Sequence, residues 1–394
     1  MLEVFRIFLH LGLTSFGGPI AHLGYYREEF VVRRRWLSDE RFSQLLAACQ
    51  FLPGPASSQM GFAIGLFRAG WPGALAAFIA FTLPSALLLF GFAGISHYLE
   101  TGAGAAAVHG LKLVAVAVVA HGLLGMARRL TPDIRRAMIA AVACVLIATT
   151  GLAWMQLAAI AFGGLLGPWL CRTVTGQTIT TFPVAYGGRA SLILAVVFVT
   201  GLVTAFAFYS KVASVTTMIA AFYQAGALVF GGGHVVLPLL KETTVATGWI
   251  GADTFLSGYG AAQAIPGPMF ALAAFLGAEI PVGIPAAWAA LLALLAIFLP
   301  GFLLLLAVLP VWSKLAAQPQ AAGVLAGINA AVVGLLAAAL YNPVWTEGVQ
   351  SVADFAIAAI AFGLLAMLRP SALWIVAWCV SASLAAYFID QFWT

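Results

Sequence analysis

Charged side chains are scarce in this sequence. Only 8% of its 394 residues are Asp, Glu, Lys or Arg, whereas 63% are hydrophobic and the mean hydropathy is +1.04. A water-soluble domain carries roughly a quarter charged residues, so the composition excludes a soluble globular protein and predicts an all-α polytopic membrane protein. Lys and Arg outnumber Asp and Glu by 18 to 13, but the cations sit in short segments beside apolar ones. This pattern is typical of cytoplasmic membrane loops and does not favour a nucleic-acid partner.

Cysteine clusters and catalytic motifs are also missing. The four cysteines are scattered through apolar segments without CxxC spacing, which predicts free thiols and neither a metal centre nor a disulfide framework. The chain has no nucleotide-binding loop, no His-Glu-x-x-His, no Gly-x-Ser-x-Gly and no paired aspartates within an apolar segment. We therefore predict no cofactor and no enzymatic activity. A membrane-embedded hydrolase is the alternative, and turnover of a lipid by the purified protein would favour it.

What the sequence does contain is one helix break that occurs twice. Gln50-Phe51-Leu52-Pro53-Gly54-Pro55 and Gln263-Ala264-Ile265-Pro266-Gly267-Pro268 each interrupt a long apolar stretch. Proline removes a backbone donor and glycine adds no side chain that holds a helix. In hydrocarbon, such a break survives only where protein or a water-filled cavity satisfies the freed backbone groups. Two breaks at matching places predict a transporter's binding site; the alternative is a simple kink in each segment.

The breaks belong to a duplication of the whole chain. Phe230-Gly231-Gly232 repeats Phe16-Gly17-Gly18 at an offset of 214 residues, and the second Pro-Gly-Pro follows the first at an offset of 213. Further matches continue in the same order, with Pro300 answering Pro84. We predict a first repeat over residues 1–172, a polar linker and connecting transmembrane helix over 173–213, and a second repeat over 214–394.

Charge indicates how the repeats are oriented. If the Gly-Gly-Pro and Pro-Gly-Pro segments are re-entrant hairpins, each half has four full spans, and the single span near 190–209 inverts the second half. With the N-terminus in the cytoplasm, fifteen of the 18 Lys and Arg lie inside, Lys211 and Lys241 lie outside, and Lys112 lies within a span. If every broken segment instead crosses the membrane fully, the excess of Lys and Arg on the cytoplasmic side becomes smaller. The repeats are inverted in both cases.

The start of each second arm is a candidate anion site. A broken helix leaves free N–H groups and a positive dipole end there. Ser57 and Ser58 add hydroxyls in the first repeat, and His234 follows the Gly231-Gly232-Gly233 break in the second. Alternatively, the two serines only cap their helix. The predicted substrate-binding residues are Gly17, Gly18, Gln50, Pro53, Gly54, Pro55, Ser57, Ser58, Lys112, Gly231, Gly232, Gly233, His234, Gln263, Pro266, Gly267, Pro268 and Asn329.

Ionisable residues inside or beside the spans allow two interpretations. In Arg27-Glu28 and Lys241-Glu242, which occupy matching positions, the cation holds the substrate and the carboxylate carries a coupled proton. Otherwise these groups are solvated at hairpin bases and contribute little. Lys112, whose repeat partner is Asn329, either lines a cavity or extends towards an interface.

As a set, three segments resemble the chromate transporter (ChrA-type) family in its long, two-domain form. They are Phe16-Gly17-Gly18-Pro19 with His22, the first Pro-Gly-Pro segment, and Phe230-Gly231-Gly232-Gly233-His234 with Leu237-Pro238-Leu239. The resemblance implies export of chromate across a bacterial inner membrane, driven by the membrane potential or a proton gradient, with sulfate as a structural analogue. It covers nearly the whole chain.

We thus predict a secondary transporter of a tetrahedral oxyanion, working by alternating access. A sulfate or other oxyanion transporter and an anion channel are the alternatives. The residues alone leave open the choice between chromate and sulfate, the coupling ion, the direction of transport, and whether the protein forms a homodimer.

Overall fold

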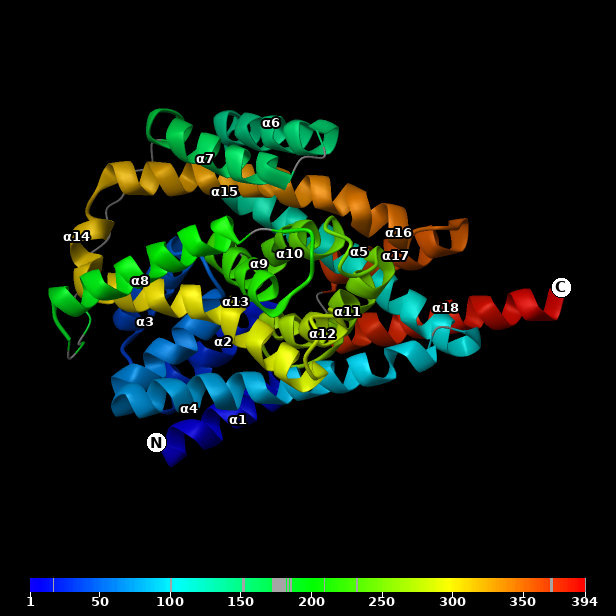
Figure 1. Cartoon of the computed structure of the whole chain (residues 1–394), viewed down its shortest axis with the longest axis horizontal. Helices are drawn as coiled ribbons and strands as arrows, with labels where there is room; N and C mark the ends of the chain where they lie inside the picture. The colour runs from blue at the N-terminus through cyan, green and yellow to red at the C-terminus, as the bar shows by residue number, and fades with distance from the viewer. Residues whose placement is uncertain are drawn as a thin grey trace.

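The structure, a computed structural model, describes residues 1–16, 18–99, 101–150, 153–171, 182, 184, 186–208, 210–231, 233–368 and 371–393. Within these ranges the chain forms helices and no strand, as the composition predicts. The first repeat contains α1 (Leu2–Thr14), α2 (Gly18–Arg27), α3 (Asp39–Phe51), α4 (Ala56–Ser96), α5 (Gly102–Leu130), α6 (Ile134–Thr150) and α7 (Ala153–Leu170) (Figure 1).

The connecting helix α8 (Gly188–Ala207) leads into the second repeat. The second repeat contains α9 (Val215–Leu228), α10 (Val236–Leu240), α11 (Ala252–Ala264), α12 (Leu272–Glu279), α13 (Ala286–Val308), α14 (Trp312–Ala316), α15 (Pro319–Ala339), α16 (Thr346–Gly348), α17 (Val352–Met367) and α18 (Ala372–Trp393). Short 3₁₀ or π turns extend several of these helices. Among the described residues, six helices are long and apolar enough to cross a membrane: those in residues 56–96, 102–130, 188–207, 286–315, 320–348 and 372–392.

The first hairpin consists of α1 and α2. The ring of Phe8 on α1 packs against Tyr26 and Phe30, with centroids 5.7 and 5.1 Å apart. These contacts bring the chain after α1 back towards α1, which itself packs along α4. At 1.5 Å per residue, α1 is about 20 Å long, which is shorter than the roughly 30 Å hydrocarbon core. The predicted break after α1 is therefore present, and a re-entrant course of this segment through the membrane stays a prediction.

The second hairpin consists of α3 and the first part of α4. Ala69 and Gly70 leave helical geometry, with φ values of −144° and 64°. The backbones of Gly65 and Gly73 touch, although eight residues of continuous helix span about 12 Å. The chain therefore reverses at Gly70, so that residues 56–68 fold back on the rest of α4. The second repeat reverses in the same way between α12 and α13.

The two repeats are inverted, as the charge distribution predicts. Helices α4 and α13 correspond to each other and run in opposite directions along the long axis of the molecule (Figure 1). The corresponding helices α5 and α15 also run in opposite directions. An axis that exchanges the repeats therefore reverses the direction of the spans, which is the arrangement of an inverted-repeat membrane protein.

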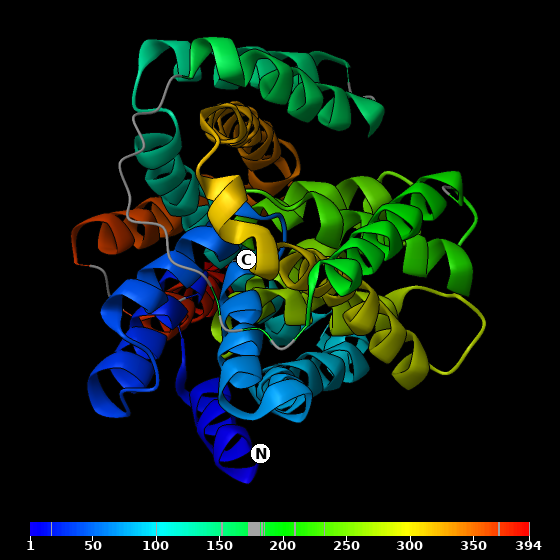
Figure 2. The same cartoon turned by 90° about the vertical axis from the view of Figure 1, so that its left-hand side faces the viewer.

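The repeats are also intertwined. Helices α6 and α7 of the first repeat pack across α15 of the second, and α17 and α18 pack against α5 of the first. Figure 2 shows α6 and α7 as a layer over α15. Small residues permit these close crossings: the backbones of Gly163 and Gly327 touch, and a Cβ on Gly110 would lie 2.9 Å from the Cys379 carbonyl oxygen. Each repeat therefore completes its packing with helices of the other.

Candidate functional site

The two Pro-Gly-Pro corners are bonded across the repeats. The backbone N–H of Gly54 donates to the carbonyl oxygen of Val229 at 2.8 Å, and the N–H of Gly267 donates to the carbonyl oxygen of Ser15 at 3.0 Å. Val229 and Ser15 occupy the same place in their repeats, one residue before the Phe-Gly-Gly break. Each corner thus contacts the broken first hairpin of the opposite repeat. These two equivalent contacts, linked through His22, mark a buried centre between the repeats.

Both corners need glycine at their middle position. Gly54 has φ of 121° and Gly267 has φ of 104°, a region that side chains rarely adopt. A Cβ on Gly54 would lie 3.0 Å from the Cα of Gly301, and one on Gly267 would lie 2.8 Å from Ser85 Oγ. Gly301 and Ser85 also correspond, because each follows the proline inside its long helix. Each corner therefore packs against the proline-containing helix of the other repeat.

Gln59 fastens the first corner to the opposite repeat. Its side chain is fully buried, and Nε2 donates to the carbonyl oxygens of Pro53 at 3.0 Å and Gly301 at 2.9 Å. The Pro53 carbonyl belongs to the corner, and the Gly301 carbonyl lies inside α13, directly after Pro300. The side chain therefore gives a donor to a corner carbonyl that the broken helix leaves free and ties that corner to the opposite repeat.

His22 connects the first corner to the second. The imidazole is fully buried, with Nε2 3.2 Å from the Ser15 carbonyl oxygen and Nδ1 3.5 Å from Ser57 Oγ. The Ser15 carbonyl also accepts the N–H of Gly267. Ser57 lies in the first turn of α4, directly after the first corner. His22 thus contacts Ser57, which follows the first corner, and the same Ser15 carbonyl that binds the second corner.

Several buried oxygens near these breaks have no hydrogen-bond partner within the described residues. They are Ser15 Oγ, Tyr26 Oη, Ser58 Oγ, Gln59 Oε1 and Thr82 Oγ1. An unsatisfied buried polar group costs about 1–3 kcal/mol, so such groups are rare unless they bond water or a ligand. Ser58 lies beside Ser57 in the first turn of α4, where free N–H groups and the positive dipole end also lie. This side of the centre is therefore suited to a small anion.

The second repeat offers a different set of polar groups. His234 Nδ1 lies 3.0 Å from Tyr259 Oη, and Gln263 Nε2 donates to Met269 Sδ at 3.6 Å. Within the described residues Asn329 Oδ1 has no hydrogen-bond partner, and it would lie 3.4 Å from a Cβ added to Gly231. Gly233 begins the 3₁₀ turn that precedes α10, and Pro266 and Pro268 flank the second corner. The site is therefore asymmetric: at the offset of 213 residues, Phe270 and Ala271 take the places of Ser57 and Ser58.

Some predicted site residues do not lie at this centre, and others fall outside the residues that the structure describes. Gln50 is exposed although its repeat partner Gln263 is buried. Gly17 and Gly232 fall outside the described residues. Gly18 begins α2 with φ of 72°. Pro53 and Pro55 flank the first corner.

The predicted cations of the first repeat have other partners. Arg27 pairs with Asp39 at 2.9 Å, with both side chains more than half exposed, and Glu28 is exposed beside it. Lys112 Nζ lies 2.7 Å from Asp253 Oδ1. Asp253 lies at the start of α11, whereas the second corner follows the other end of that helix, about 15 Å further along. The Lys112 ammonium therefore lies away from the corners.

Lys241 and Glu242 lie in a turn outside the candidate spans. Lys241 Nζ donates to the backbone oxygen of Asn342 at 3.1 Å, and Gln156 Nε2 donates to Glu242 Oε2 at 3.4 Å. Burial raises the pKa of the Glu242 carboxyl, an effect that Lys241 opposes, and burial lowers the pKa of Lys241. Both pKa shifts favour the neutral forms of Glu242 and Lys241. They are compatible with the hypothesis that the Glu242 carboxyl takes up a proton.

Sequence reasoning missed His22 and Gln59 as site residues. A signal for both exists, because each is a polar residue inside an apolar segment directly after a helix break. It missed Ser15 and Val229 for a different reason. Their contribution is a backbone carbonyl, which no side-chain pattern reveals.

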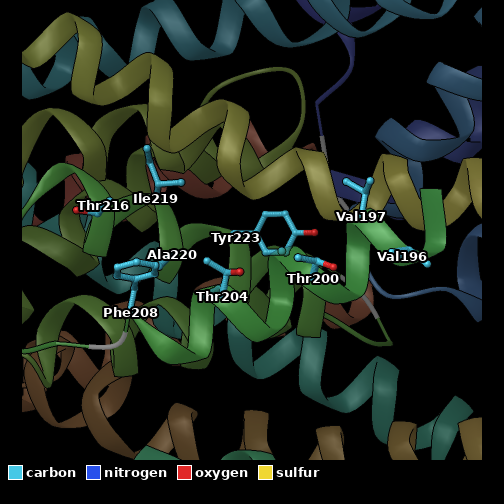
Figure 3. Close-up of a pocket in the computed structure, with 11 residues that line it drawn as sticks. Val196, Val197, Thr200, Thr204, Phe208, Thr216, Ile219, Ala220 and Tyr223 are labelled. Atoms are coloured by element: carbon cyan, nitrogen blue, oxygen red, sulfur yellow. The ribbon is translucent and has the colours of Figure 1, made fainter. Parts of the chain in front are cut away.

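A groove of about 490 Å³ lies elsewhere, between α8 and α9 (Figure 3). Its lining includes Val197, Thr204, Ile219 and Tyr223, and the Tyr223 hydroxyl donates to the Phe198 carbonyl oxygen at 3.0 Å. No charged residue lines it. This mostly apolar groove on the side of the connecting helix lacks the donors that a dianion requires.

Inverted repeats with broken helices in a polytopic helical membrane protein are typical of membrane transporters. The chain belongs to the chromate transporter family: the family model, described as "Chromate transporter", matches residues 2–168 and 216–384. The two matches coincide with the two repeats, and the stretch between them contains the linker and α8. The resemblance seen in the sequence is thereby confirmed.

Individual relatives support the same assignment. The chain is 29% identical to a chromate transport protein of Pseudomonas aeruginosa over 342 residues, which cover 85% of this chain and 79% of that protein. It is 27% identical to a chromate transport protein of Cupriavidus metallidurans over 385 residues, covering 93% and 87%. An uncharacterized transporter of Bacillus subtilis, YwrA, is 31% identical over 178 residues, covering 43% of this chain and 98% of that protein. No solved structure matches the chain.

Proposed function

We propose that the protein exports a tetrahedral oxyanion, chromate first, across the inner membrane by alternating access, driven by the membrane potential or a proton gradient. The observation that carries the proposal is the crossed pair of bonds from Gly54 to Val229 and from Gly267 to Ser15. These bonds support one shared centre at which helix ends of both repeats converge. The names of the relatives favour chromate over sulfate.

The first corner supplies neutral donors to the anion. The first N–H groups of α4 have no intrahelical acceptor, and the hydroxyls of Ser57 and Ser58 lie in the same turn. A dipole end contributes about 0.3–1 kcal/mol when exposed and up to about 2 kcal/mol when partly buried. Because dehydrating a dianion costs far more, these donors need further groups, including a positive charge, to converge on the anion. The second corner, whose Gly267 N–H is already bonded to Ser15, encloses the site from the other repeat, and Asn329 is a candidate polar group on that side.

The remaining predicted roles stay part of this proposal. The N-terminus is cytoplasmic, and the hairpin-bearing elements move against the other spans around the fixed centre. Arg27, Glu28, Lys241 and Glu242 are the candidate groups for coupling and charge balance at the hairpin bases.

Replacing either corner glycine by leucine tests the site assignment. Gly54→Leu and Gly267→Leu place a side chain where φ disfavours it and where the backbone of Gly301 or the side chain of Ser85 already lies. We expect chromate transport to fall on the order of a hundredfold, as it does when binding groups are displaced by about 1 Å. Gly94→Leu is the matched control, because Gly94 lies in α4 with open space around it.

Transport is measured as chromate or sulfate uptake into inverted vesicles, with and without a pH gradient, after confirming that each variant reaches the membrane. Normal export by both corner variants would overturn the site assignment. Equal uptake of sulfate and chromate would broaden the substrate class. Flux that follows voltage without saturation would identify an anion channel.

A further inference from the structure

The dianion requires a positive charge that the permanent cations near the centre do not supply. Arg27 is paired with Asp39 at an exposed hairpin base, and Lys112 is paired with Asp253 at the start of α11. A partly dehydrated dianion bound only by neutral donors is strongly disfavoured. Histidine gains its charge near neutral pH, and His22 contacts both Ser57, which follows the first corner, and the Ser15 carbonyl that binds the second corner.

The contacts of His22 determine its neutral tautomer. A carbonyl oxygen only accepts hydrogen bonds, so Nε2, 3.2 Å from the Ser15 carbonyl, must carry the hydrogen. Nδ1 then has the lone pair and accepts from the Ser57 hydroxyl, whose Oγ lies 3.5 Å away. The contact is long, but in this state the Ser57 hydrogen points towards the imidazole.

Protonation reverses the polarity of this contact. A proton from water adds to Nδ1, which then donates and no longer accepts, so the Ser57 hydroxyl is free to turn its hydrogen towards a neighbouring anion. The same step adds one positive charge beside the first turn of α4. An anion bound at Ser57 and Ser58 in turn stabilises the imidazolium. By linkage, each ligand raises the affinity of the other by the same factor.

We propose that His22 takes up one proton together with each oxyanion, so that the proton and the substrate share the site at the first corner. This inference rests on the proposed function, because it assigns a co-transported proton to the same site. The proton returns to water from Nδ1 when the anion leaves on the opposite side, and both move in the same direction. One net negative charge then leaves the cell per cycle, so the membrane potential, and not the proton gradient, favours this export.

The groups packed around His22 do not neutralise the positive charge that protonation would give it. On α4, the ring of Phe81 lies edge-on at a centroid distance of 5.2 Å, beside Ser57. On α2, Tyr26 packs against the same Phe81 ring and is the other titratable group nearby. Among the described residues, no carboxylate forms a hydrogen bond or an ion pair with His22. His234 differs, because it bonds Tyr259 and lies against α5 at Gly122, next to a second histidine.

The test is the pH dependence of sulfate binding to the purified full-length protein, measured by equilibrium dialysis with labelled sulfate between about pH 6 and 8. If one proton accompanies each anion, wild-type affinity weakens by about tenfold per pH unit over the range in which the free imidazole is neutral. His22→Gln should bind weakly, with no slope in the same range. His10→Gln is the matched control, because His10 is an exposed histidine on α1, and it should retain the wild-type slope.

A second measurement does not depend on how the variants fold. Adding sulfate to wild-type protein in weakly buffered solution should remove about one proton per bound anion from the medium at the upper end of that pH range. A flat wild-type profile, a slope retained by His22→Gln, or no proton uptake would each overturn the role of His22. Failure to bind either chromate or sulfate at any pH would instead refute the proposed function itself.

Discussion

Gln59 provides a direct test of how the two repeats are held together. Replacing it with methionine keeps a similar volume but removes the two hydrogen bonds to the carbonyls of Pro53 and Gly301. The Pro53 carbonyl loses its donor at about 1–3 kcal/mol, whereas the Gly301 carbonyl, inside α13, loses only a second hydrogen bond at about 0.5–1.5 kcal/mol. The change also removes Oε1, an unpartnered buried oxygen, and so restores about 1–3 kcal/mol. We expect Gln59→Met to lower the free energy of unfolding by about 1 kcal/mol.

The assay is thermal unfolding in detergent, followed by tryptophan fluorescence, together with chromate uptake. Gln50→Met is the matched control, because Gln50 precedes the same corner but is exposed, and a surface change of this kind stays within about 0.5 kcal/mol. The predicted signature is a lowered unfolding temperature in Gln59→Met and none in Gln50→Met. Equal unfolding temperatures in both variants and the wild type would refute the claim that Gln59 fastens the corner to the opposite repeat.

Two further predictions address the packing of the repeats. Asp253→Asn should destabilise the protein, and adding Lys112→Met should offset part of that loss. A double-mutant cycle should give a coupling energy of about 0.5–3 kcal/mol, at the lower end of this range because the Asp253 side chain is 65% exposed. Strictly additive effects would show that the ion pair contributes nothing. If the chain is divided within the linker, between residues 172 and 187, the two halves should copurify when they are expressed together. Each half expressed alone should fail to give a monodisperse protein, because α6 and α7 pack on α15 of the other half. Halves that each purify as stable monomers would contradict the intertwined packing.

The helix breaks and the inversion of the repeats could be predicted from the sequence. Pro53-Gly54-Pro55 cannot continue a helix, its second copy marks the same place in the other half, and charge in the short loops orients both. These signals act through local backbone chemistry and composition, which a single sequence records directly. The same proline and glycine breaks indicate where the helices begin and end.

The crossed packing could not be predicted. Matching residues show that two copies exist, but they do not say whether α7 packs on α5 or on its counterpart α15. The partners of Gly54 and Gly267 are the backbone carbonyls of Val229 and Ser15, and every residue has such a carbonyl. Lys112 appears in the sequence as a lone charge because its partner, Asp253, lies far along the chain in the other repeat.

The most direct test of the account is an experimentally determined structure of the full-length protein with chromate or sulfate bound. The account predicts a tetrahedral ligand at the start of α4, within hydrogen-bonding distance of Ser57 or Ser58, with the Gly267 corner completing the enclosure from the other repeat. Corners that lie apart, or an anion bound away from both of them, would contradict it.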